Sequence, residues 1–160
     1  MMRVGIGYDV HRFASGRRLV LGGVQIPHEF GLEGHSDADV VLHAVSDAVL
    51  GAAGKGDIGE HFPPTDECWR AADSTDLLRR SLVIAGTEWG IVNLDIVVQA
   101  EEPKIGPYRD AIRERIGLVL GIDAKRVNIK ATTTEGLGFV GRREGIAATA
   151  TVLLERRNND

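Results

Sequence analysis

Alternating apolar and polar residues indicate where the strands of this chain lie. Between residues 91 and 98, apolar side chains alternate with Asn93 and Asp95, which is the period-two pattern of a half-buried strand. Runs rich in β-branched and small apolar residues predict three more strands, at residues 3–8, 127–131 and 146–154. The pattern therefore predicts a sheet of about four main strands.

Two shorter apolar runs, residues 18–21 and 24–26, flank the pair Gly22-Gly23. Two glycines between apolar runs are typical of a tight hairpin turn, so we expect a small N-terminal hairpin. Further along the chain, residues 54–72 show no regular period. Long irregular stretches of this kind are often functional loops.

Apolar residues at helical spacing predict three helices. The first follows Ser36 and Asp39, which are spaced like a capping box, and it ends at Gly54. The other two are expected at about residues 74–85 and 108–120. His43 lies within the first of these helices.

The composition fits one globular domain that covers residues 1–160. The chain has 160 residues, of which 43% are hydrophobic, and no repeat or linker divides it. A net charge of −4 argues against a nucleic-acid-binding surface, and no apolar run approaches the roughly 20 residues of a membrane helix. Because Cys68 is the only cysteine and no secretory or transit segment is seen, we expect a protein of the bacterial cytoplasm. Trp69 and Trp89 are expected to be packing or surface residues.

One carboxylate and two imidazoles are candidate metal ligands. Asp9 and His11 stand two residues apart at the end of the first predicted strand, so their side chains project from the same face, and His43 follows on a helix. These ligand types suit Zn²⁺, and three protein ligands leave a fourth tetrahedral position open. Asp39 or Asp47, one helical turn on either side of His43, is expected to accept its other ring N–H. A turn, a satisfied histidine or a helix-surface ion pair is the alternative interpretation.

Two clusters of hydrogen-bond donors are candidates for binding phosphate. The first leaves a predicted strand through Thr132, Thr133 and Thr134 and continues with Glu135 and two glycines. Hydroxyls and loop N–H groups donate to phosphate oxygens, and Glu135 is a hard oxygen ligand for Mg²⁺ or Mn²⁺. Local side-chain to backbone bonding is the alternative. The second cluster, residues 35–39, precedes a helix, where free N–H groups favour an anion, although its serine fits a simple N-cap role as well.

Several sequence blocks occur together and in order along the chain. They are Gly7-Tyr8-Asp9-Val10-His11-Arg12-Phe13, Gly34-His35-Ser36-Asp37-Ala38-Asp39, Gly56-Asp57-Ile58-Gly59 with Phe62-Pro63-Pro64-Thr65-Asp66, and Ala131-Thr132-Thr133-Thr134-Glu135 with Glu144-Gly145-Ile146-Ala147. Through these blocks the chain resembles the family of 2-C-methyl-D-erythritol 2,4-cyclodiphosphate synthases from about residue 3 to residue 154. The resemblance implies an α/β (α+β sandwich) fold with a mixed sheet and helices on one face. It also implies a homotrimer with active sites between neighbouring subunits.

The resemblance implies a step of the non-mevalonate isoprenoid pathway. In this step the 2-phosphate of 4-diphosphocytidyl-2-C-methyl-D-erythritol 2-phosphate attacks the β-phosphorus, which closes a cyclic diphosphate and releases CMP. Asp9, His11 and His43 match the family's zinc ligands, and Glu135 matches the ligand of a second divalent ion, Mg²⁺ or Mn²⁺. A transfer between two anions needs positioning and charge neutralisation more than a side-chain nucleophile.

The same resemblance assigns roles around the substrate. His35 and Ser36 are expected to hold the reacting phosphates, Thr133 the phosphate of the leaving nucleotide, and Asp57 with Gly59 the erythritol hydroxyls. Of these, His35 and Thr133 are the implied catalytic residues. The full set implied for substrate binding is Asp9, His11, His35, Ser36, Asp57, Ile58, Gly59, Phe62, Pro63, Pro64, Thr65, Asp66, Ala100, Pro103, Lys104, Ile105, Gly106, Ala131, Thr132, Thr133, Thr134, Glu135, Phe139 and Arg142.

Some positions depart from the family pattern. Pro64 stands where many relatives have Asp, and Gly136 where some have Lys, so contacts of those side chains do not carry over. Tyr8, Arg142 and Glu144 resemble positions around the trimer axis, where isoprenoid diphosphates lodge in relatives. A zinc-dependent phosphodiesterase or hydrolase with water as nucleophile, and a non-catalytic nucleotide or metal binder, are the alternative functions.

Overall fold

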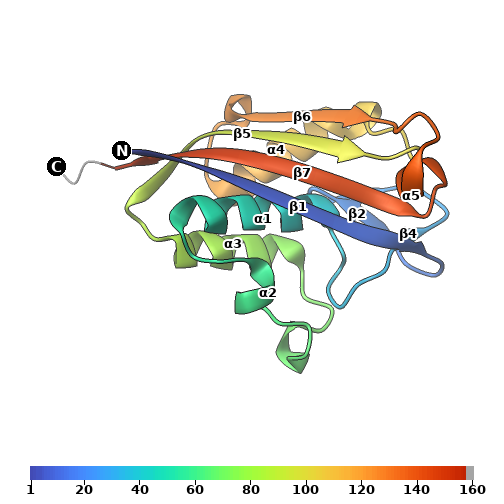
Figure 1. Cartoon of the computed structure of the whole chain (residues 1–160), viewed down its shortest axis with the longest axis horizontal. Helices are drawn as coiled ribbons and strands as arrows, with labels where there is room; N and C mark the ends of the chain where they lie inside the picture. The colour runs from blue at the N-terminus through green and yellow to red at the C-terminus, as the bar shows by residue number, and fades with distance from the viewer. Residues whose placement is uncertain (158–160) are drawn as a thin grey trace.

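The computed structural model describes residues 1–157, and its main sheet has five strands in the order β4-β1-β7-β5-β6 (Figure 1). The strands are β1 (Met2–Ala14), β4 (Gly31–Leu32), β5 (Trp89–Gln99), β6 (Val127–Thr132) and β7 (Gly145–Arg156). Strands β5 and β6 pair in parallel and the other neighbours pair antiparallel, so the sheet is mixed. A separate hairpin pairs β2 (Leu19–Leu21) with β3 (Val24–Ile26), as predicted.

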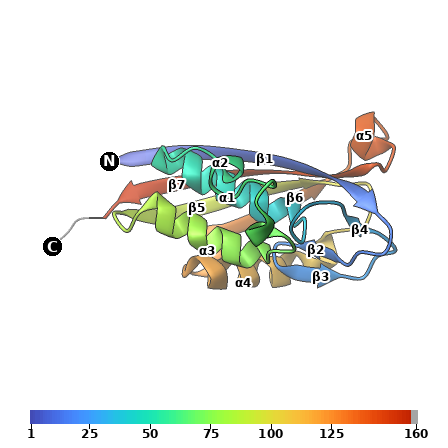
Figure 2. The same ribbon diagram turned by 90° about the horizontal axis from the view of Figure 1, so that it is seen from below.

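Three helices cover one face of this sheet (Figure 2). They are α1 (Val40–Ala53), α3 (Ser74–Ala85) and α4 (Arg109–Leu120). The connections contain two short helices, α2 (Ile58–His61) and α5 (Gly138–Gly141), and 3-10 turns at Glu67–Trp69, Gly106–Tyr108 and Ala124–Arg126. The predicted fold class is confirmed, and within residues 1–157 no helix combines the length and apolar character needed to cross a membrane.

Strand β1 packs directly against helix α1 because it carries glycine where the two backbones approach. A Cβ on Gly5 would overlap the carbonyl oxygen of Ala48, and a Cβ on Gly7 would overlap that of Ala44. Side chains of alternate strand residues share a face, so Asp9 follows Gly5 and Gly7 on the helix-facing side. The close packing therefore brings the ligand-bearing end of β1 next to α1.

Replacing Gly5 with alanine should lower the free energy of unfolding by about 3 kcal/mol, because the added methyl group meets backbone atoms that cannot move aside. Gly51→Ala is the matched control, since a Cβ at Gly51 has only the carbonyl oxygen of Ile6 near it, at 3.9 Å. Alanine in this helical position should be neutral or add up to about 1 kcal/mol. Urea unfolding of both variants is the measurement, and equal stabilities would contradict the close approach.

The opposite face of β1 is apolar and uncovered. The outward side chains Val4, Ile6, Tyr8 and Val10 have relative exposures of 69%, 70%, 53% and 43%. Monomeric proteins rarely leave such rows of large apolar side chains in water. The sheet thus has a helix-covered face and an apolar open face.

Strand β1 is longer than the sequence pattern predicts, because it continues from Tyr8 to Ala14. Asp9 pairs with Ala148 of β7, and His11 pairs with Ile146, so both lie within the strand rather than at its exit. Polar residues interrupt the apolar run here, although backbone pairing to β7 goes on. The expectation that Asp9 and His11 share one face still holds, since it depends only on the strand period.

Helix α1 has Asp39 rather than Ser36 as its N-cap, which corrects the predicted start. The Asp39 carboxylate accepts the N–H of Leu42 at 3.0 Å. An earlier start is blocked because Ala38 has a φ of +57°, outside the right-handed helical region. Ser36 bonds locally instead, since its Oγ accepts the N–H of Ala38 at 3.1 Å.

Candidate metal site and pocket

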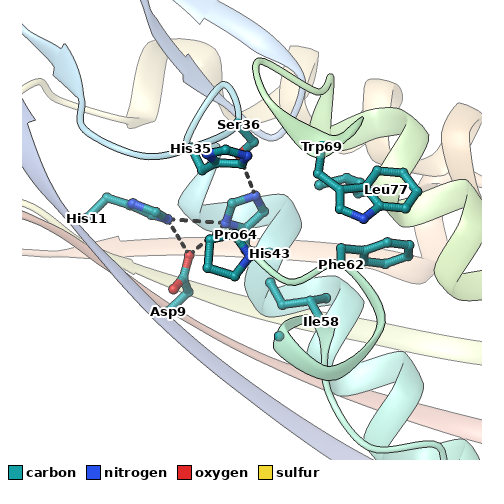
Figure 3. A pocket seen from close by; sticks show the side chains of 11 residues that line it. Asp9, His11, His35, Ser36, His43, Ile58, Phe62, Pro64, Trp69 and Leu77 are labelled. Atoms are coloured by element: carbon teal, nitrogen blue, oxygen red, sulfur yellow. Dashed lines mark hydrogen bonds and ion pairs between the residues drawn. The ribbon is translucent and has the colours of Figure 1, made fainter. Parts of the chain in front are cut away.

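Asp9, His11 and His43 converge on one point between strand β1 and helix α1 (Figure 3). Asp9 Oδ2 lies 2.9 Å from His11 Nε2 and 3.0 Å from His43 Nδ1, and the two ring nitrogens are 3.2 Å apart. Zinc bonds of about 2.0–2.2 Å place tetrahedral ligand atoms roughly 3.3 Å from one another. This triangle of one oxygen and two nitrogens therefore fits a tetrahedral metal ion, with the fourth position left for another ligand.

A backbone contact determines which ring nitrogen of His11 faces this point. His11 Nδ1 lies 2.7 Å from the carbonyl oxygen of Glu33. A carbonyl oxygen only accepts, so Nδ1 carries the hydrogen, and in the neutral ring Nε2 presents its lone pair to Asp9 and His43. At this distance the lone pair and the carboxylate need a proton or a metal ion between them, so Nε2 is oriented to bind a metal ion when one is present.

The pKa shifts of Asp9 and His11 indicate that this point favours positive charge. Burial raises the pKa of Asp9, but the hydrogen bonds and charges of His11 and His43 outweigh it and lower the pKa from 3.8 to about 2. Burial lowers the pKa of His11, whereas the hydrogen bond and charge of Asp9 raise it, and the net effect is an increase. Asp9 is therefore ionised at neutral pH and is the anionic ligand of the set.

The other ring nitrogen of His43 contacts two serines, and not Asp39 or Asp47 as the helical spacing predicted. His43 Nε2 lies 2.9 Å from Ser74 Oγ and 3.2 Å from Ser36 Oγ. The two carboxylates are turned away because backbone N–H groups of the hairpin and of α2 occupy them. Ser74 comes from another helix, so spacing around His43 could not reveal it.

Asp39 is a fully buried carboxylate that ties the β2–β3 hairpin to helix α1. Besides capping the helix, it accepts the N–H groups of Gly22 at 2.8 Å and Gly23 at 2.7 Å. Burial raises its pKa from 3.8 to about 6, although the hydrogen bonds from Gly23 and Leu42 act in the opposite direction. Its role is to hold the elements around the site together.

Because the pKa of Asp39 in the folded protein is above its unfolded value, its charged form opposes folding. This unfavourable contribution, up to about 3 kcal/mol, is present above pH 6 and disappears as the pH falls toward 4. Asp39→Asn cannot titrate, and its amide group faces an N–H donor, so it should be less stable than the parent. The difference between the two should widen between pH 7 and pH ~4.5. Urea unfolding at both pH values checks this, and a constant or narrowing difference would contradict it.

The triad opens into a pocket beside α1 and α2 (Figure 3). The predicted substrate-binding residues that line it are Asp9, His11, His35, Ser36, Ile58, Gly59, Phe62 and Pro64. Trp69 and Leu77 line it too and were not predicted as site residues. Trp69 does pack, as expected, but it packs edge-on against Phe62 in the pocket wall, with ring centroids 5.0 Å apart. A single tryptophan in an irregular stretch carries no sequence signal for that position.

The remaining predicted residues of the same loops flank the pocket without lining it. They are Asp57, Pro63, Thr65 and Asp66. The Asp57 carboxylate caps α2 by accepting the N–H of Glu60 at 2.9 Å. The carbonyl oxygen of Asp66 lies 3.3 Å from His35 Nε2, so this loop contacts the predicted phosphate-binding histidine.

The threonine-rich loop and Glu135 do not line the triad pocket within one chain. Strand β6, which leads into this loop, is separated from β1 by β7 and β5, or about 14 Å at the usual strand spacing (Figure 1). Phe139 lines a separate hollow with His11 and Glu144. Within residues 1–157, the predicted site residues that do not line the triad pocket also include Ala100, Pro103, Lys104, Ile105, Gly106, Ala131, Thr132, Thr133, Thr134, Glu135, Phe139 and Arg142. One chain therefore leaves Glu135 and the threonine-rich loop outside the triad pocket.

Known proteins share both the sequence and the fold of this chain. The profile of the YgbB family matches residues 2–155, and the chain belongs to this family. The 2-C-methyl-D-erythritol 2,4-cyclodiphosphate synthase of Symbiobacterium thermophilum is 64% identical over 157 residues, which cover 98% of this chain and 100% of the relative. The synthase of the same name from Geotalea uraniireducens is 57% identical and covers 98% of this chain and 100% of its own length.

Solved structures of similar proteins have the same fold as this chain. The bifunctional IspDF from Campylobacter jejuni matches with a TM-score of 0.94 and 43% identity, over 99% of this chain but 43% of that longer chain. The CDP complex of IspF from Plasmodium falciparum matches with a TM-score of 0.85 and 37% identity, over 98% of this chain and 97% of that one. The family resemblance predicted from the sequence is thus confirmed.

Proposed function

We infer that this chain converts 4-diphosphocytidyl-2-C-methyl-D-erythritol 2-phosphate to 2-C-methyl-D-erythritol 2,4-cyclodiphosphate and CMP, a step of the non-mevalonate isoprenoid pathway. The observation that carries the inference is the Asp9–His11–His43 triangle beside a pocket, in a chain that matches a synthase of this name over 98% of its length. Two solved relatives hold CDP, which is the nucleotide part of such a substrate. A hydrolase is not favoured, because relatives at high identity are cyclodiphosphate synthases. As expected from the sequence, we place the step in the bacterial cytoplasm.

We assign Zn²⁺ to Asp9, His11 and His43, and a second divalent ion, Mg²⁺ or Mn²⁺, to Glu135. Such ions, when bound, neutralise phosphate charge and polarise phosphoryl oxygens. The donor set of one ionised carboxylate and two imidazoles suits zinc, and a lone carboxylate beside a diphosphate suits a hard cation. Glu135 also has a φ of +54°, an uncommon conformation for a non-glycine residue that is found at functional positions.

In the proposed reaction, an oxygen of the 2-phosphate bonds to the β-phosphorus while the bond from this phosphorus to the CMP oxygen breaks. The attacking phosphate is already ionised, so no side chain has to remove a proton. His35 and Ser36 hold the reacting phosphates, and Ser36 Oγ already accepts a backbone N–H, which leaves its hydroxyl hydrogen for a phosphate oxygen. Thr133 contacts the leaving phosphate, and Asp57 with Gly59 holds the erythritol hydroxyls.

We propose that three copies assemble through the open face of the sheet and complete one another's sites. The exposed side chains of Val4, Ile6, Tyr8 and Val10 supply apolar surface that assembly would remove from water. The separation of Glu135 and its loop from the triad supports this arrangement, because a neighbouring copy is then needed to bring the two groups together.

An isoprenoid diphosphate is proposed to bind near the axis of this trimer, at Tyr8, Arg142 and Glu144. Arg142 Nη2 lies 3.2 Å from Glu144 Oε2 in an exposed pair, so the guanidinium is accessible to a second anion. Titration of geranyl diphosphate in a thermal-shift assay should raise the Tm. No shift with an intact trimer would count against this site.

The proposed function is tested by following the substrate with ³¹P NMR after incubation with the protein, zinc and magnesium. The synthase predicts the signals of a cyclic diphosphate and of CMP in equal amounts. A hydrolase would give a linear phosphorylated alcohol, and a non-catalytic binder would leave the substrate unchanged. Either of those results would overturn the proposal.

A further inference from the structure

Beyond the residues assigned above, a chain of hydrogen bonds leads from His43 to a carboxylate outside the pocket. His43 Nε2 lies 2.9 Å from Ser74 Oγ, and Ser74 Oγ donates a short hydrogen bond to Asp37 Oδ1. The Ser74 N–H also donates to Asp37 Oδ2 at 3.0 Å. Ser74 is the first residue of α3 and is fully buried, so its bond to His43 joins α3 to α1 away from water, while Asp37 is partly buried.

The hydrogens in this chain can be placed because each group has limited capacity. The Asp37 carboxylate only accepts, so the single hydroxyl hydrogen of Ser74 points toward it. Ser74 Oγ then offers a lone pair to His43, and His43 Nε2 must carry the ring hydrogen. In the neutral imidazole Nδ1 is left with the lone pair, and Nδ1 is the atom 3.0 Å from Asp9 Oδ2.

We propose that Asp37, acting through Ser74, is the positioning residue that holds His43 in the tautomer and ring orientation required to bind the metal ion. The proposal rests on the metal site proposed above. Partners of this kind on the far nitrogen of a ligating histidine typically contribute roughly 10- to 100-fold to metal affinity. His11 has the equivalent restraint from the Glu33 carbonyl, so both imidazoles of the triad are oriented by their second nitrogen.

The competing explanation is that Asp37 only caps helix α3. The same helix offers a control, because its N-cap Asp73 accepts the N–H of Thr75 at 2.8 Å and its hydroxyl at 2.6 Å. Asp73→Asn weakens capping without touching the bonds of His43. If Asp37 only capped the helix, Asp37→Asn and Asp73→Asn should change the affinity for zinc by the same amount.

Asp37→Asn has a specific expected consequence. Each Asp37 oxygen accepts a backbone N–H, Oδ2 that of Ser74 and Oδ1 that of Asp39 at 3.1 Å, so an Asn amide must set its NH₂ against one of them, and the carboxylate that fixes the Ser74 hydroxyl is lost. The Ser74 hydroxyl hydrogen is then no longer held on residue 37 and can point at His43 Nε2, which opposes the tautomer that binds metal. Ser74→Ala removes the Ser74 hydroxyl that accepts from His43 Nε2 but leaves Ser36 Oγ at 3.2 Å from this nitrogen. The loss of zinc affinity should therefore be smaller than in Asp37→Asn.

The test is the affinity of the full-length protein for Zn²⁺, measured by competition with a chromophoric chelator, for the parent and the three variants. We expect the Kd to rise roughly 10- to 100-fold for Asp37→Asn, less for Ser74→Ala, and to stay within about twofold for Asp73→Asn. In the Co²⁺-substituted protein, the exchangeable ring N–H signal of His43 should change in Asp37→Asn while that of His11 stays. If Asp37→Asn fails to fold, the zinc affinity of Ser74→Ala relative to Asp73→Asn still tests the positioning role.

Equal zinc affinity in Asp37→Asn and Asp73→Asn, with an unchanged His43 signal, would overturn the positioning role. That result is distinct from a failure of the proposed function. A zinc-loaded parent that forms no cyclic diphosphate would defeat the function, while the ranking of zinc affinities would still decide the role of Asp37.

Discussion

Replacing Asp9 with alanine is expected to lower the rate of cyclic diphosphate formation by roughly 10³-fold or more, because it removes the anionic member of the proposed zinc ligand set. The remaining imidazoles of His11 and His43 are neutral ligands and leave a cation without charge compensation. The hydrogen bonds that lower the pKa of Asp9 to about 2 show how strongly the site pairs this carboxylate with positive charge. The fold should survive, since the Asp9 side chain is partly exposed and lies among polar groups.

The rate is measured by ³¹P NMR and the zinc content by mass spectrometry of the purified protein. Asp76→Ala is the matched control, because Asp76 forms an exposed ion pair with Arg79 on α3 and does not line the triad pocket. Its activity should stay within about twofold of the parent, as exposed ion pairs contribute little. Near-normal turnover by a zinc-free Asp9→Ala protein would show that the triad is not the catalytic metal site.

Introducing aspartate at Ile6 is expected to dissociate the proposed trimer and, with it, to abolish turnover. Ile6 is 70% exposed in the single chain and lies in the middle of the apolar row on β1. A carboxylate placed there would have to be buried without a partner when copies assemble, which is strongly unfavourable. The separated monomer would then lack the loop around Glu135 that a neighbour is proposed to supply.

Val83→Asp is the control for this variant, since Val83 is 79% exposed on helix α3, away from the open face of the sheet. Light scattering coupled to size-exclusion chromatography should give a monomer for Ile6→Asp and a trimer for Val83→Asp. A fully active monomer would contradict the shared site. An Ile6→Asp protein that remains a trimer would contradict the proposed interface.

The spacing of apolar residues predicted most of the strands and helices, because the residues buried within one element follow the period of that element. The strand period put Asp9 and His11 on one face even though β1 proved longer than predicted, since only their spacing of two residues matters. The apolar run predicted that β1 ends too early. The polar residues in the second half of β1 continue the strand because their backbone pairs with β7. Side-chain patterns do not report that pairing.

Contacts between distant segments were beyond the reach of the sequence pattern. The helical spacing favoured Asp39 and Asp47 as partners of His43, but Ser74, 31 residues away, and Ser36 take that place. Trp69 lies in the pocket wall because it packs edge-on against Phe62, a residue of the loop after α2. Such contacts are set by how helices and loops pack, so a periodicity confined to one element cannot reveal them.

The most direct test of this account is anomalous diffraction at the zinc absorption edge from crystals of the active protein with CMP bound. The proposed zinc site predicts an anomalous peak about 2.0–2.2 Å from Asp9 Oδ2, His11 Nε2 and His43 Nδ1, with the fourth position facing the bound phosphate. Crystals of active, zinc-containing protein with no peak between these three residues would contradict it.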